Sequence, residues 1–554
     1  MNLLSLIKQY GIRDLAYRYF ESKDTANRSA KYLENISSFL PTEAELTAQR
    51  NAHFDYEPTF SIVVPAYETK EVFLKELVDS VLGQTYGKLE LIIADGSKSD
   101  IVRKYLDNYN DDRIVYIKLK ENTGISGNTN EGFSHVKGDY VALLDHDDVL
   151  TLNALYEMVK VLNEVSPRPD MVYSDEDKLN QATGQFTDPS FKPDYNEYFL
   201  RHVNYICHFL IYSKELLDKV GGLDAAYDGA QDHEFILRCA ANGAKIAHIP
   251  KILYHWRIHP ESTAADPNSK LYAFNNGMKA IEKYLKSVGD PGQVSLTKDL
   301  GIYTIKYDMP KDKLKVLVLS ENETQLDRMK KTAFDEACDY SNKCEITWKI
   351  NSQHNSAADN KSSDNNLYNN NSCGTSSCDY SSYDYIVCTK HAAVPATKNW
   401  LGKMLRTVTN KNVAIVAAKC LGSDNKVLSC GATYQISTQG SNVVSLYEGI
   451  NRHFHGYNHR AIDVTTNVSL DPLYMAIMKS DVFCEYQREK DVYALCLKLN
   501  NDGKHVLVDT EIVAKVSGVN QIPDKLSDKA IRLVKKYDPY YTPNTSIEKG
   551  QFLL

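Results

Sequence analysis

The sequence predicts an α/β protein with two consecutive domains, each with helices packed on a mostly parallel sheet. From Phe60 onward, short apolar runs alternate with amphipathic segments of helical length, which is typical of strand–helix–strand units. Near Lys311 the same alternation begins again with a strand-like run. The 554 residues also exceed what one hydrophobic core usually accommodates, so at least two domains are expected.

Residues 1–57 precede the first strand and alternate helical patterns with polar breaks. The first 31 residues carry six basic and three acidic side chains. We interpret this segment as a helix packed on the next domain, with its charges in solvent. The alternative is a basic amphipathic helix in peripheral contact with an anionic membrane surface.

The first domain is predicted to span residues 58–310. Its strand-like runs end in polar side chains, and in a parallel sheet the carboxyl ends of the strands form the ligand-binding edge. We therefore expect functional residues at these ends. The runs alternate as strand and helix, beginning and ending with a strand, over residues 60–67, 71–84, 89–97, 101–109, 113–119, 128–138 and 139–148.

A second, degenerate copy of this domain is predicted over residues 311–520. The stretch DYIVCTKHAAVP, residues 384–395, follows the apolar pattern of DYVALLDHDDVL, residues 139–150. In a later pair of matching stretches, Gly503 stands where Gly243 stands in the first half. Two matches in the same order indicate an internal duplication.

Two further segments complete the second half. Residues 351–382 are too poor in apolar side chains to pack, so we expect a disordered surface loop there. Residues 521–554 are expected to form a C-terminal tail. The eleven cysteines, including Cys373 and Cys378 in the polar loop, follow no C-x-x-C spacing, which favours reduced, packed thiols over a zinc site.

Acidic side chains gather at the predicted carboxyl edge of the first sheet. Asp95 ends one strand-like run, and Asp145, Asp147 and Asp148 end another. Two carboxylates at positions x and x+2 beyond a buried strand repel each other unless a cation lies beside them, and Mg²⁺ or Mn²⁺ meets that need. We therefore expect Asp145 and Asp147 to bind a metal, and Asp148 to be a helix cap or a surface charge.

Seven segments of the first domain resemble, in order and spacing, the inverting nucleotide-sugar glycosyltransferases of family 2, which have the Rossmann-like GT-A fold. The resemblance covers residues 60–263. The flanking stretches AELTAQR and DPYYTPN further resemble the cytosolic subgroup that builds bacterial surface polysaccharides, including rhamnosyltransferases. The seven segments are SIVVPAYET, ELIIADGSKSD, ENTGISGNTNEGF, LLDHDD, YSDEDKL, GGLDAAYDGAQDHEFILR and YHWRIH.

The resemblance implies a binding site for a nucleoside-diphosphate sugar, with UDP- and dTDP-linked donors both open. Three of its residues are expected to line the nucleotide base and a fourth, an aspartate, to accept a hydrogen bond from it. The remaining ones are expected to contact the ribose, diphosphate or sugar. In chain order the expected contacts are Pro65, Tyr67, Glu68, Asp95, Gly96, Ser97, Asn122, Asp145, His146 and Arg257.

The resemblance also implies a metal and a general base. Asp147, Asp145 and His259 are expected to hold Mn²⁺ or Mg²⁺, which would offset the charge on the departing nucleoside diphosphate. Asp232 is expected to take the proton from an acceptor hydroxyl as its oxygen attacks the anomeric carbon, with inversion of configuration. The family usually has Glu-Asp here, whereas Gln231 precedes Asp232, which removes one acidic neighbour.

The acceptor side is less sharply marked. Glu234 and Asp175 are its candidate contacts, and Glu234 is also open to interpretation as a surface charge. His255, beside the Arg257–His259 pair, is expected to be a solvated or core histidine rather than a ligand. The choice of sugar is expected to lie with residues 173–229.

The second copy is predicted to have lost catalysis. Lys390 and Ala392 stand where the metal-binding acids are in the first copy. Opposite Asp232 stands Val492 or, without a one-residue slip, Asp491. Segments such as NRHFHGYNHRAID contain aromatic and histidine side chains suited to stacking on sugar rings, so we hypothesise that this copy holds the growing glycan or pairs with another subunit.

The sequence therefore favours a metal-dependent, inverting glycosyltransferase acting on a lipid-linked surface polysaccharide at the cytoplasmic side of the membrane. Two alternatives are weighed against it. A catalytically silent glycan-binding scaffold conflicts with the intact acids of the first domain. A nucleotidyltransferase would open with a Gly-rich, basic loop, which VVPAYETKE is not. The net charge of −8 argues against nucleic acid as a partner, and no apolar run approaches the ~20 residues of a membrane span.

Overall fold

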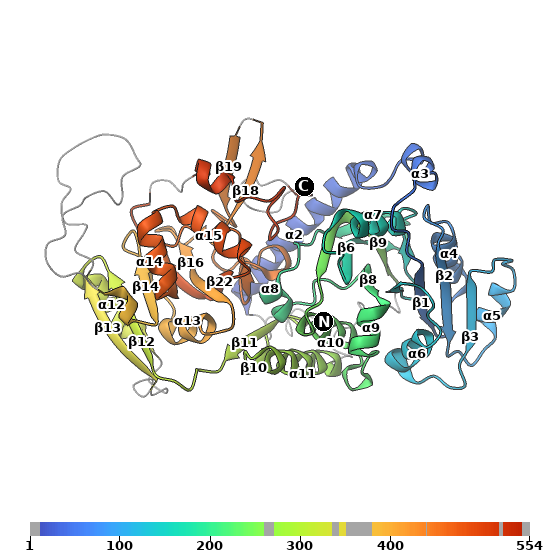
Figure 1. The fold of residues 1–554 in the computed structure, drawn as a ribbon, viewed down its shortest axis with the longest axis horizontal. Helices are drawn as coiled ribbons and strands as arrows, with labels where there is room; N and C mark the ends of the chain where they lie inside the picture. Colours follow the sequence, from blue (N-terminus) through green and yellow to red (C-terminus); the bar gives the residue numbers. More distant parts are fainter. Residues whose placement is uncertain are drawn as a thin grey trace.

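The computed structural model contains two α/β domains that lie side by side, with a long N-terminal helix between them (Figure 1). The described residues are 11–259, 271–334, 343–350, 379–438, 440–519 and 524–545. The predicted loop 351–382 lies outside them except for 379–382, which include a 3-10 turn at Tyr380–Ser382. Of the helices in these ranges, none is long and apolar enough to cross a membrane.

Helix α2 (Ile12–Glu34) is packed, as the favoured interpretation of the N-terminal segment predicts. Its Tyr32 is wholly buried, donates a 2.6 Å hydrogen bond to Asp177 and packs edge-on against Phe191. A 3-10 turn (Ile36–Ser38) leads to helix α3 (Glu43–Arg50), which begins with a capping box formed by Thr42 and Glu45.

The first domain is built on a nine-stranded sheet in the order β3-β2-β1-β4-β8-β6-β9-β5, with β7 beside β6. The predicted mostly parallel sheet is correct only for β3, β2, β1 and β4 and for the β6–β9 pair, so the sheet is mixed. Strand β8 accounts for most of the antiparallel pairing, because it lies between β4 and β6 and runs antiparallel to both. Its four residues are too few to show a periodicity from which its direction could be predicted. The strands are β1 (Phe60–Ala66), β2 (Leu89–Asp95), β3 (Ile114–Lys118), β4 (Tyr140–Leu143), β5 (Val149–Leu150), β6 (Met171–Asn180), β7 (Phe186–Ser190), β8 (Leu210–Ser213) and β9 (Ile246–Ile258).

Near-continuous burial along β1 and β2 is what a strand covered on both faces by helices requires. Helices α8 and α9 begin at residues whose side chains accept backbone N–H bonds, Asn196 and Ser213. Helix α11 (Leu271–Val288) and the hairpin β10 (Gly292–Leu296) and β11 (Tyr303–Tyr307) then lead to the second domain. The other helices are α4 (Glu71–Leu82), α5 (Ile101–Leu106), α6 (Gly124–Phe133), α7 (Ala154–Glu164), α8 (Glu197–His202), α9 (Lys214–Val220), η2 (Ala225–Tyr227) and α10 (Gln231–Ala241).

The second domain repeats this strand order. Its sheet runs β13-β12-β14-β21-β16-β22-β15, with β17 beside β16, and each neighbouring pair has the same relative direction as its counterpart in β2-β1-β4-β8-β6-β9-β5 and β7. The predicted second α/β domain is therefore present, again with a mixed sheet. Its strands are β12 (Leu314–Ser320), β13 (Cys344–Ile350), β14 (Tyr385–Thr389), β15 (Val394–Pro395), β16 (Val413–Leu421), β17 (Val427–Ser429), β20 (Thr465–Asn467), β21 (Met475–Lys479) and β22 (His505–Lys515).

Helices occur at matching points of the two domains. In the second domain, α12 follows β12, α13 follows β15, and α14 and α15 follow β21. In the first domain, α4 follows β1, α7 follows β5, and α9 and α10 follow β8, with only the short turn η2 between α9 and α10. Between β17 and β20 the second domain has a hairpin, which projects at the top of Figure 1, and then the segment 446–460. The remaining elements are α12 (Glu323–Thr332), α13 (Trp400–Val408), β18 (Ala432–Ser437), β19 (Gly440–Ser445), η7 (Tyr457–His459), α14 (Ser480–Glu489), α15 (Val492–Asn501) and α16 (Asp528–Ile531).

The domains meet through buried polar contacts. The amide of Asn196 donates to the Thr466 hydroxyl at 3.0 Å, and the backbone N–H of Phe191 donates to the Tyr457 hydroxyl at 2.7 Å. The C-terminal tail returns to the first domain, where Asn544 donates to Asp175 at 2.7 Å. The predicted tail is thus an interdomain tie.

Candidate active site

The candidate site lies at the carboxyl ends of β1, β2 and β4. The strand order reverses between β1 and β4, and such a switch point is where open α/β sheets bind ligands. Asp95 ends β2, and Asp145 is the second residue after the end of β4. The two expected halves of the site, for the base and for the diphosphate, therefore share one edge.

Asp95 is fully buried and strongly hydrogen-bonded. It accepts from the Ser97 N–H at 2.9 Å, the Tyr116 hydroxyl at 2.8 Å and the Lys118 ammonium at 3.1 Å. Burial raises its pKa, but these donors outweigh burial and the pKa lies below the usual value. An ionised, preorganised acceptor results.

The expected base-lining residues form a rim around Asp95. Glu68 has φ of 47° and accepts hydrogen bonds from the backbone N–H groups of Lys98 and Ser99 at 2.7 and 3.1 Å. Tyr67 is 43% exposed, Pro65 is half-buried at the end of β1, and Ser97 accepts from the Glu68 N–H at 2.7 Å. A Cβ on Gly96 would approach Asn128 Nδ2 to 2.9 Å, and this amide itself donates to Asn122 at 2.9 Å.

Asp145 is a half-buried carboxylate that receives no hydrogen bond from the described residues. Burial raises its pKa, the nearby His208 lowers it, and Asp147 and Asp232 raise it further, so the pKa lies above the usual value. His146 Nδ1 is likewise buried without a described partner. This is a site in which negative charge is concentrated and incompletely compensated.

Asp147 is held from two sides. Its carboxylate lies 2.9 Å from His259 Nε2, and its backbone carbonyl accepts a hydrogen bond from Arg257 Nε. The Arg257 guanidinium is 1% exposed and pairs with Glu76 at 2.5 Å, so it links Asp147 to helix α4. Contact of Arg257 with a diphosphate stays a prediction.

The neighbouring residues Asp148 and His255 are structural. Asp148 was expected to be a helix cap or a surface charge, but it is fully buried. It accepts hydrogen bonds from the Tyr254 hydroxyl and the Arg257 N–H. His255, as expected of a core histidine, is buried and lies 2.6 Å from Asp177.

Asp232 lies in the first turn of α10, half-buried, and accepts a 2.8 Å hydrogen bond from the Asn204 amide. Gln231 turns back to accept from the Gly229 N–H at 2.7 Å. Glu234 is not a surface charge: it is 2% exposed and pairs with Arg238 and Lys283, both at 2.9 Å. The Lys283 pair links α10 to α11. Because both partners pair with the Glu234 carboxylate, this carboxylate does not face an acceptor, although that had been expected.

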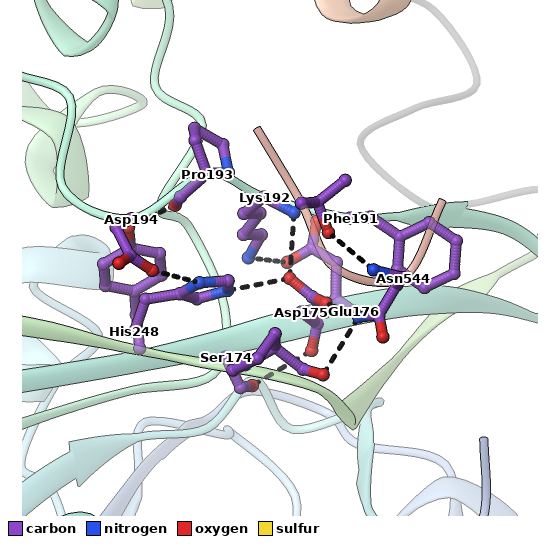
Figure 2. Close-up of polar contacts among 12 residues, drawn as sticks. Ser174, Asp175, Glu176, Phe191, Lys192, Pro193, Asp194, His248 and Asn544 are labelled. Carbon is purple, nitrogen blue, oxygen red and sulfur yellow. Dashed lines mark hydrogen bonds and ion pairs between the residues drawn. The ribbon is translucent and has the colours of Figure 1, made fainter. Parts of the chain in front are cut away.

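Asp175 lies in a buried polar cluster rather than on an open surface (Figure 2). It accepts hydrogen bonds from the Lys192 N–H at 2.8 Å and Asn544 at 2.7 Å, and lies 2.9 Å from His248 Nε2. Asp194 approaches the other nitrogen of His248 at 3.1 Å. The tail stretch DPYYTPN thus closes on the YSDEDKL stretch of β6, and no surface of Asp175 is left for an acceptor.

Lys192 and Asn204 lie in the region 173–229 that was expected near the sugar, but neither was singled out as a site residue. Lys192 Nζ, wholly buried, pairs with Glu176 at 3.0 Å and donates to the backbone carbonyls of Ile206 and His208. Lys192 thereby holds residues 204–208 in place. In this segment Asn204 donates to Asp232, and His208 lies near Asp145. The only sequence signal was a lone lysine in the aromatic run FKPDYNEYF.

The second domain presents different chemistry at the matching positions. Lys390 follows β14 and donates to the Pro472 carbonyl at 3.2 Å, and the Ala392 N–H donates to Glu321 at 2.9 Å. Asp491 caps α15 by accepting from the Ala494 N–H at 3.0 Å. The described residues there include no acidic pair beyond β14.

Comparison with known proteins identifies the first domain. Residues 61–221 match the family model described as glycosyl transferase family 2. The chain therefore carries a family 2 glycosyltransferase domain. The match ends before Asp232, Arg257 and His259, so it does not bear on those residues.

Relatives are found among curated proteins. An uncharacterised protein of Sinorhizobium fredii is 37% identical over 233 residues, 41% of this chain and 25% of that protein. The O-antigen biosynthesis protein RfbC of Myxococcus xanthus is 31% identical over 272 residues, 48% of this chain and 21% of that protein. The Escherichia coli UDP-Glc:alpha-D-GlcNAc-diphosphoundecaprenol beta-1,3-glucosyltransferase WfaP is 27% identical over 226 residues, 40% of this chain and 86% of that enzyme. The chain thus spans a quarter or less of the first two relatives.

Solved structures with some similarity include S. aureus TarS 1-349 in complex with UDP-GlcNAc, at 18% identity and a TM-score of 0.35, covering 43% of this chain and 68% of that one. Another is the mannosyltransferase PcManGT from Pyrobaculum calidifontis in complex with GDP-Man and Mn²⁺, at 16% identity and a TM-score of 0.31, covering 44% and 79%.

Proposed function

We propose that this protein transfers a sugar, with inversion, from a nucleoside-diphosphate sugar to a hydroxyl of a growing, lipid-linked surface polysaccharide. The family match supports glycosyl transfer, and the names of the M. xanthus and E. coli relatives support a surface-glycan acceptor. The observation that carries the proposal is the incompletely compensated Asp145–Asp147 pair near Asp232 at the switch point of the sheet.

The donor is proposed to lie along the carboxyl edge from Asp95 to Asp147. Asp95, which already accepts hydrogen bonds from Ser97, Tyr116 and Lys118, is proposed to accept one more from a base that lies against the rim of Tyr67 and Glu68. We favour a UDP- or dTDP-linked sugar, since uracil and thymine each have an N3–H group that can donate to a carboxylate. The diphosphate then reaches Asp145 and Asp147.

The residues at the diphosphate end fit a divalent metal. Asp145 is a half-buried acid with no described hydrogen-bond donor, and burial, together with Asp147 and Asp232, raises its pKa, so a cation there would stabilise its ionised form. Asp145, Asp147 and His259 supply oxygen and nitrogen ligands suited to Mn²⁺ or Mg²⁺. When bound, such an ion acts as a Lewis acid that stabilises charge on the leaving diphosphate.

Asp232 is proposed as the general base. The Asn204 amide fixes one of its carboxylate oxygens, which leaves the other to accept the proton of the acceptor hydroxyl. That hydroxyl oxygen forms a bond to the anomeric carbon from the face opposite the phosphate. The bond to the phosphate oxygen breaks, and the nucleoside diphosphate departs with its electron pair.

The second domain is proposed to be a degenerate repeat of the first. The matching strand order, pair directions and helix positions support duplication. A shift in register falls at the same point of both central pairs, after Ser174 in β6 and after Ala418 in β16. Lys390, Ala392 and the helix-capping Asp491 support the loss of catalysis.

The test is thermal stability of the full chain against nucleotides and nucleotide sugars, with and without Mn²⁺, for wild type and Asp147→Asn. A ligand that binds only the folded protein at a hundred times its Kd stabilises it by about 2.7 kcal/mol. We expect one nucleotide class to raise the midpoint only with metal, and only in wild type. Release of nucleoside diphosphate supports the proposal, whereas pyrophosphate would indicate a nucleotidyltransferase, and no response to any nucleotide would overturn the proposal.

A further inference from the structure

A large cavity lies where helix α2, the β6–β7 hairpin and the segment 446–460 of the second domain meet. Its volume is about 880 Å³, within the range typical of ligand-binding clefts. The side chains of α2 that line it extend from Glu21 to Glu34, about 20 Å of helix at 1.5 Å per residue. It is therefore elongated and has room for several linked sugar rings.

Glu176 places the cavity next to the segment that supports the candidate active site. Glu176 lines the cavity, and its carboxylate pairs with Lys192 at 3.0 Å and accepts from the His208 N–H at 3.3 Å. Four residues earlier, Asn204 donates to the proposed base Asp232 at 2.8 Å. A single short segment thus separates the cavity from the position where the acceptor hydroxyl must lie.

The lining has the chemistry of a site for uncharged sugars. Phe454 supplies a half-exposed aromatic face, onto which the apolar face of a sugar ring can pack, while Tyr447 and Tyr457 are buried in the wall. Among the described residues that line it, five carboxylates stand against three lysines and arginines. Because Glu176 is paired with Lys192 and Glu21 with His455, the lining carries little net charge, which suits uncharged sugars. The exposed carboxylates of Asp24 and Glu34 can accept hydrogen bonds from hydroxyl groups.

The cavity walls are held firmly by contacts that span the chain. The Ser29 hydroxyl donates to Asp188 at 2.7 Å, and the Arg28 guanidinium stacks over the Tyr457 ring at 5.3 Å. At the far end, Arg18 forms a two-pronged bridge to Asp299 at 2.6 and 2.7 Å, next to His455, which bonds Glu21 at 2.8 Å. The site exists only where α2 and the second domain pack together.

We infer that this cavity binds the uncharged oligosaccharide part of the acceptor, namely the sugars that precede the one being extended. The inference rests on the proposed function for the direction of the chain, and it gives the second domain a role in acceptor recognition. The terminal sugar then reaches Asp232 past the segment that Glu176 supports, and sugars added earlier follow along α2.

The test compares two variants of exposed or half-buried lining residues with a matched control. Phe454→Ala removes an aromatic face, Asp24→Asn removes a carboxylate, and Phe20→Ala removes an exposed ring of α2 outside the cavity. The probes are neutral di- to hexasaccharides of glucose, N-acetylglucosamine, mannose and rhamnose, with Kd measured by calorimetry and saturation-transfer NMR. Thermal midpoints confirm that each variant is folded.

We expect at least one probe to bind wild type and Phe20→Ala equally, and to bind Phe454→Ala and Asp24→Asn about tenfold or more weakly. Failure of all probes to bind wild type, or binding that survives both lining variants, would overturn the inference. Nucleotide binding is measured on the same samples. If nucleotides bind and glycans do not, the inference alone fails; if glycans bind at the cavity without any nucleotide response, the transferase proposal fails.

Discussion

The two domains share a strand order but carry different residues after β4 and its counterpart β14. After β4 the first domain has Asp145 and Asp147, whereas after β14 the second has Lys390 and Ala392. The difference teaches that the sheet sets where a ligand can bind, while side chains at the strand ends decide whether chemistry follows. Five predictions test this contrast, from the largest expected effect to the smallest.

The largest effect is expected at the metal-binding acids. Asp147→Asn should lower the transfer rate by about 10⁴-fold, because stabilisation of the leaving diphosphate by a metal is worth several kcal/mol. The matched change in the second domain, Lys390→Ala, should leave the rate unchanged. Steady-state release of nucleoside diphosphate measures both, and equal loss in the two variants would refute the view that the second domain is silent.

Asp232→Asn should lower kcat by about 10³-fold, since a general base typically contributes 10²- to 10⁴-fold. Donor binding should be retained, because Asp232 contacts Asn204 and the proposed acceptor only. Titration of the nucleotide by calorimetry supplies the control. Unchanged kcat would remove Asp232 from the mechanism.

Replacing each of the buried lysines Lys192 and Lys419 should lower the free energy of unfolding by a different amount. Lys192→Met leaves Glu176 without its cation and should cost about 3 kcal/mol, since breaking a buried pair strands the remaining charge. Lys419 donates to the carbonyls of Arg452 and Ala461, has no carboxylate partner, and burial lowers its pKa. Lys419→Met should therefore cost about 1 kcal/mol. Urea unfolding followed by fluorescence compares them, and equal costs would contradict the prediction.

Buried acids of the two domains should respond differently to pH. Burial raises the pKa of Asp471 to about 7, so this residue lowers stability as pH rises from its unfolded value towards 7. The free energy of unfolding of Asp471→Asn, relative to that of wild type, should then rise by about 2 to 3 kcal/mol from pH 5 to pH 8.

Asp95 is the matched control for Asp471. Its hydrogen-bond donors lower its pKa, so its contribution is present above the unfolded value and is lost only as pH falls through the lower folded value. The effect of Asp95→Asn should therefore be the same at pH 5 and pH 8. A pH-independent Asp471→Asn would show that the carboxyl group does not titrate in this range.

The smallest effect is expected at the start of α15. Asp491 accepts from the Ala494 N–H, so Asp491→Ala should lower stability by about 1 kcal/mol, the usual cost of a lost helix cap. Transfer activity should not change. A loss of activity at normal stability would indicate that Asp491 does more than cap a helix.

Much of the first domain was predictable because its strands are continuous apolar runs that end in polar residues. The positions of Asp95, Asp145 and Asp147 at strand ends follow directly from that pattern. The repeat of the apolar run at residues 385–389 likewise predicted a second domain. The direction of β8 was not predictable, because four residues carry no signal of their partner strands.

The burial of charged side chains was also beyond prediction. Glu234 was expected at the acceptor side, yet Arg238 and Lys283 enclose it. Asp175 was expected there too, yet Asn544, which lies 369 residues away, covers it. An acid in a sequence shows its charge but not its partners, and those partners come from separate elements.

The sequence by itself determined the α/β class, the repeated strand pattern and the acids placed at strand ends, because periodicity and strand ends are local properties. Only the tertiary structure decided which of these acids stay open and which are enclosed, how Lys192 supports the candidate active site, and that α2 and the second domain form a cavity. The reason is that burial and pairing depend on contacts between residues far apart in the chain, which no local pattern encodes.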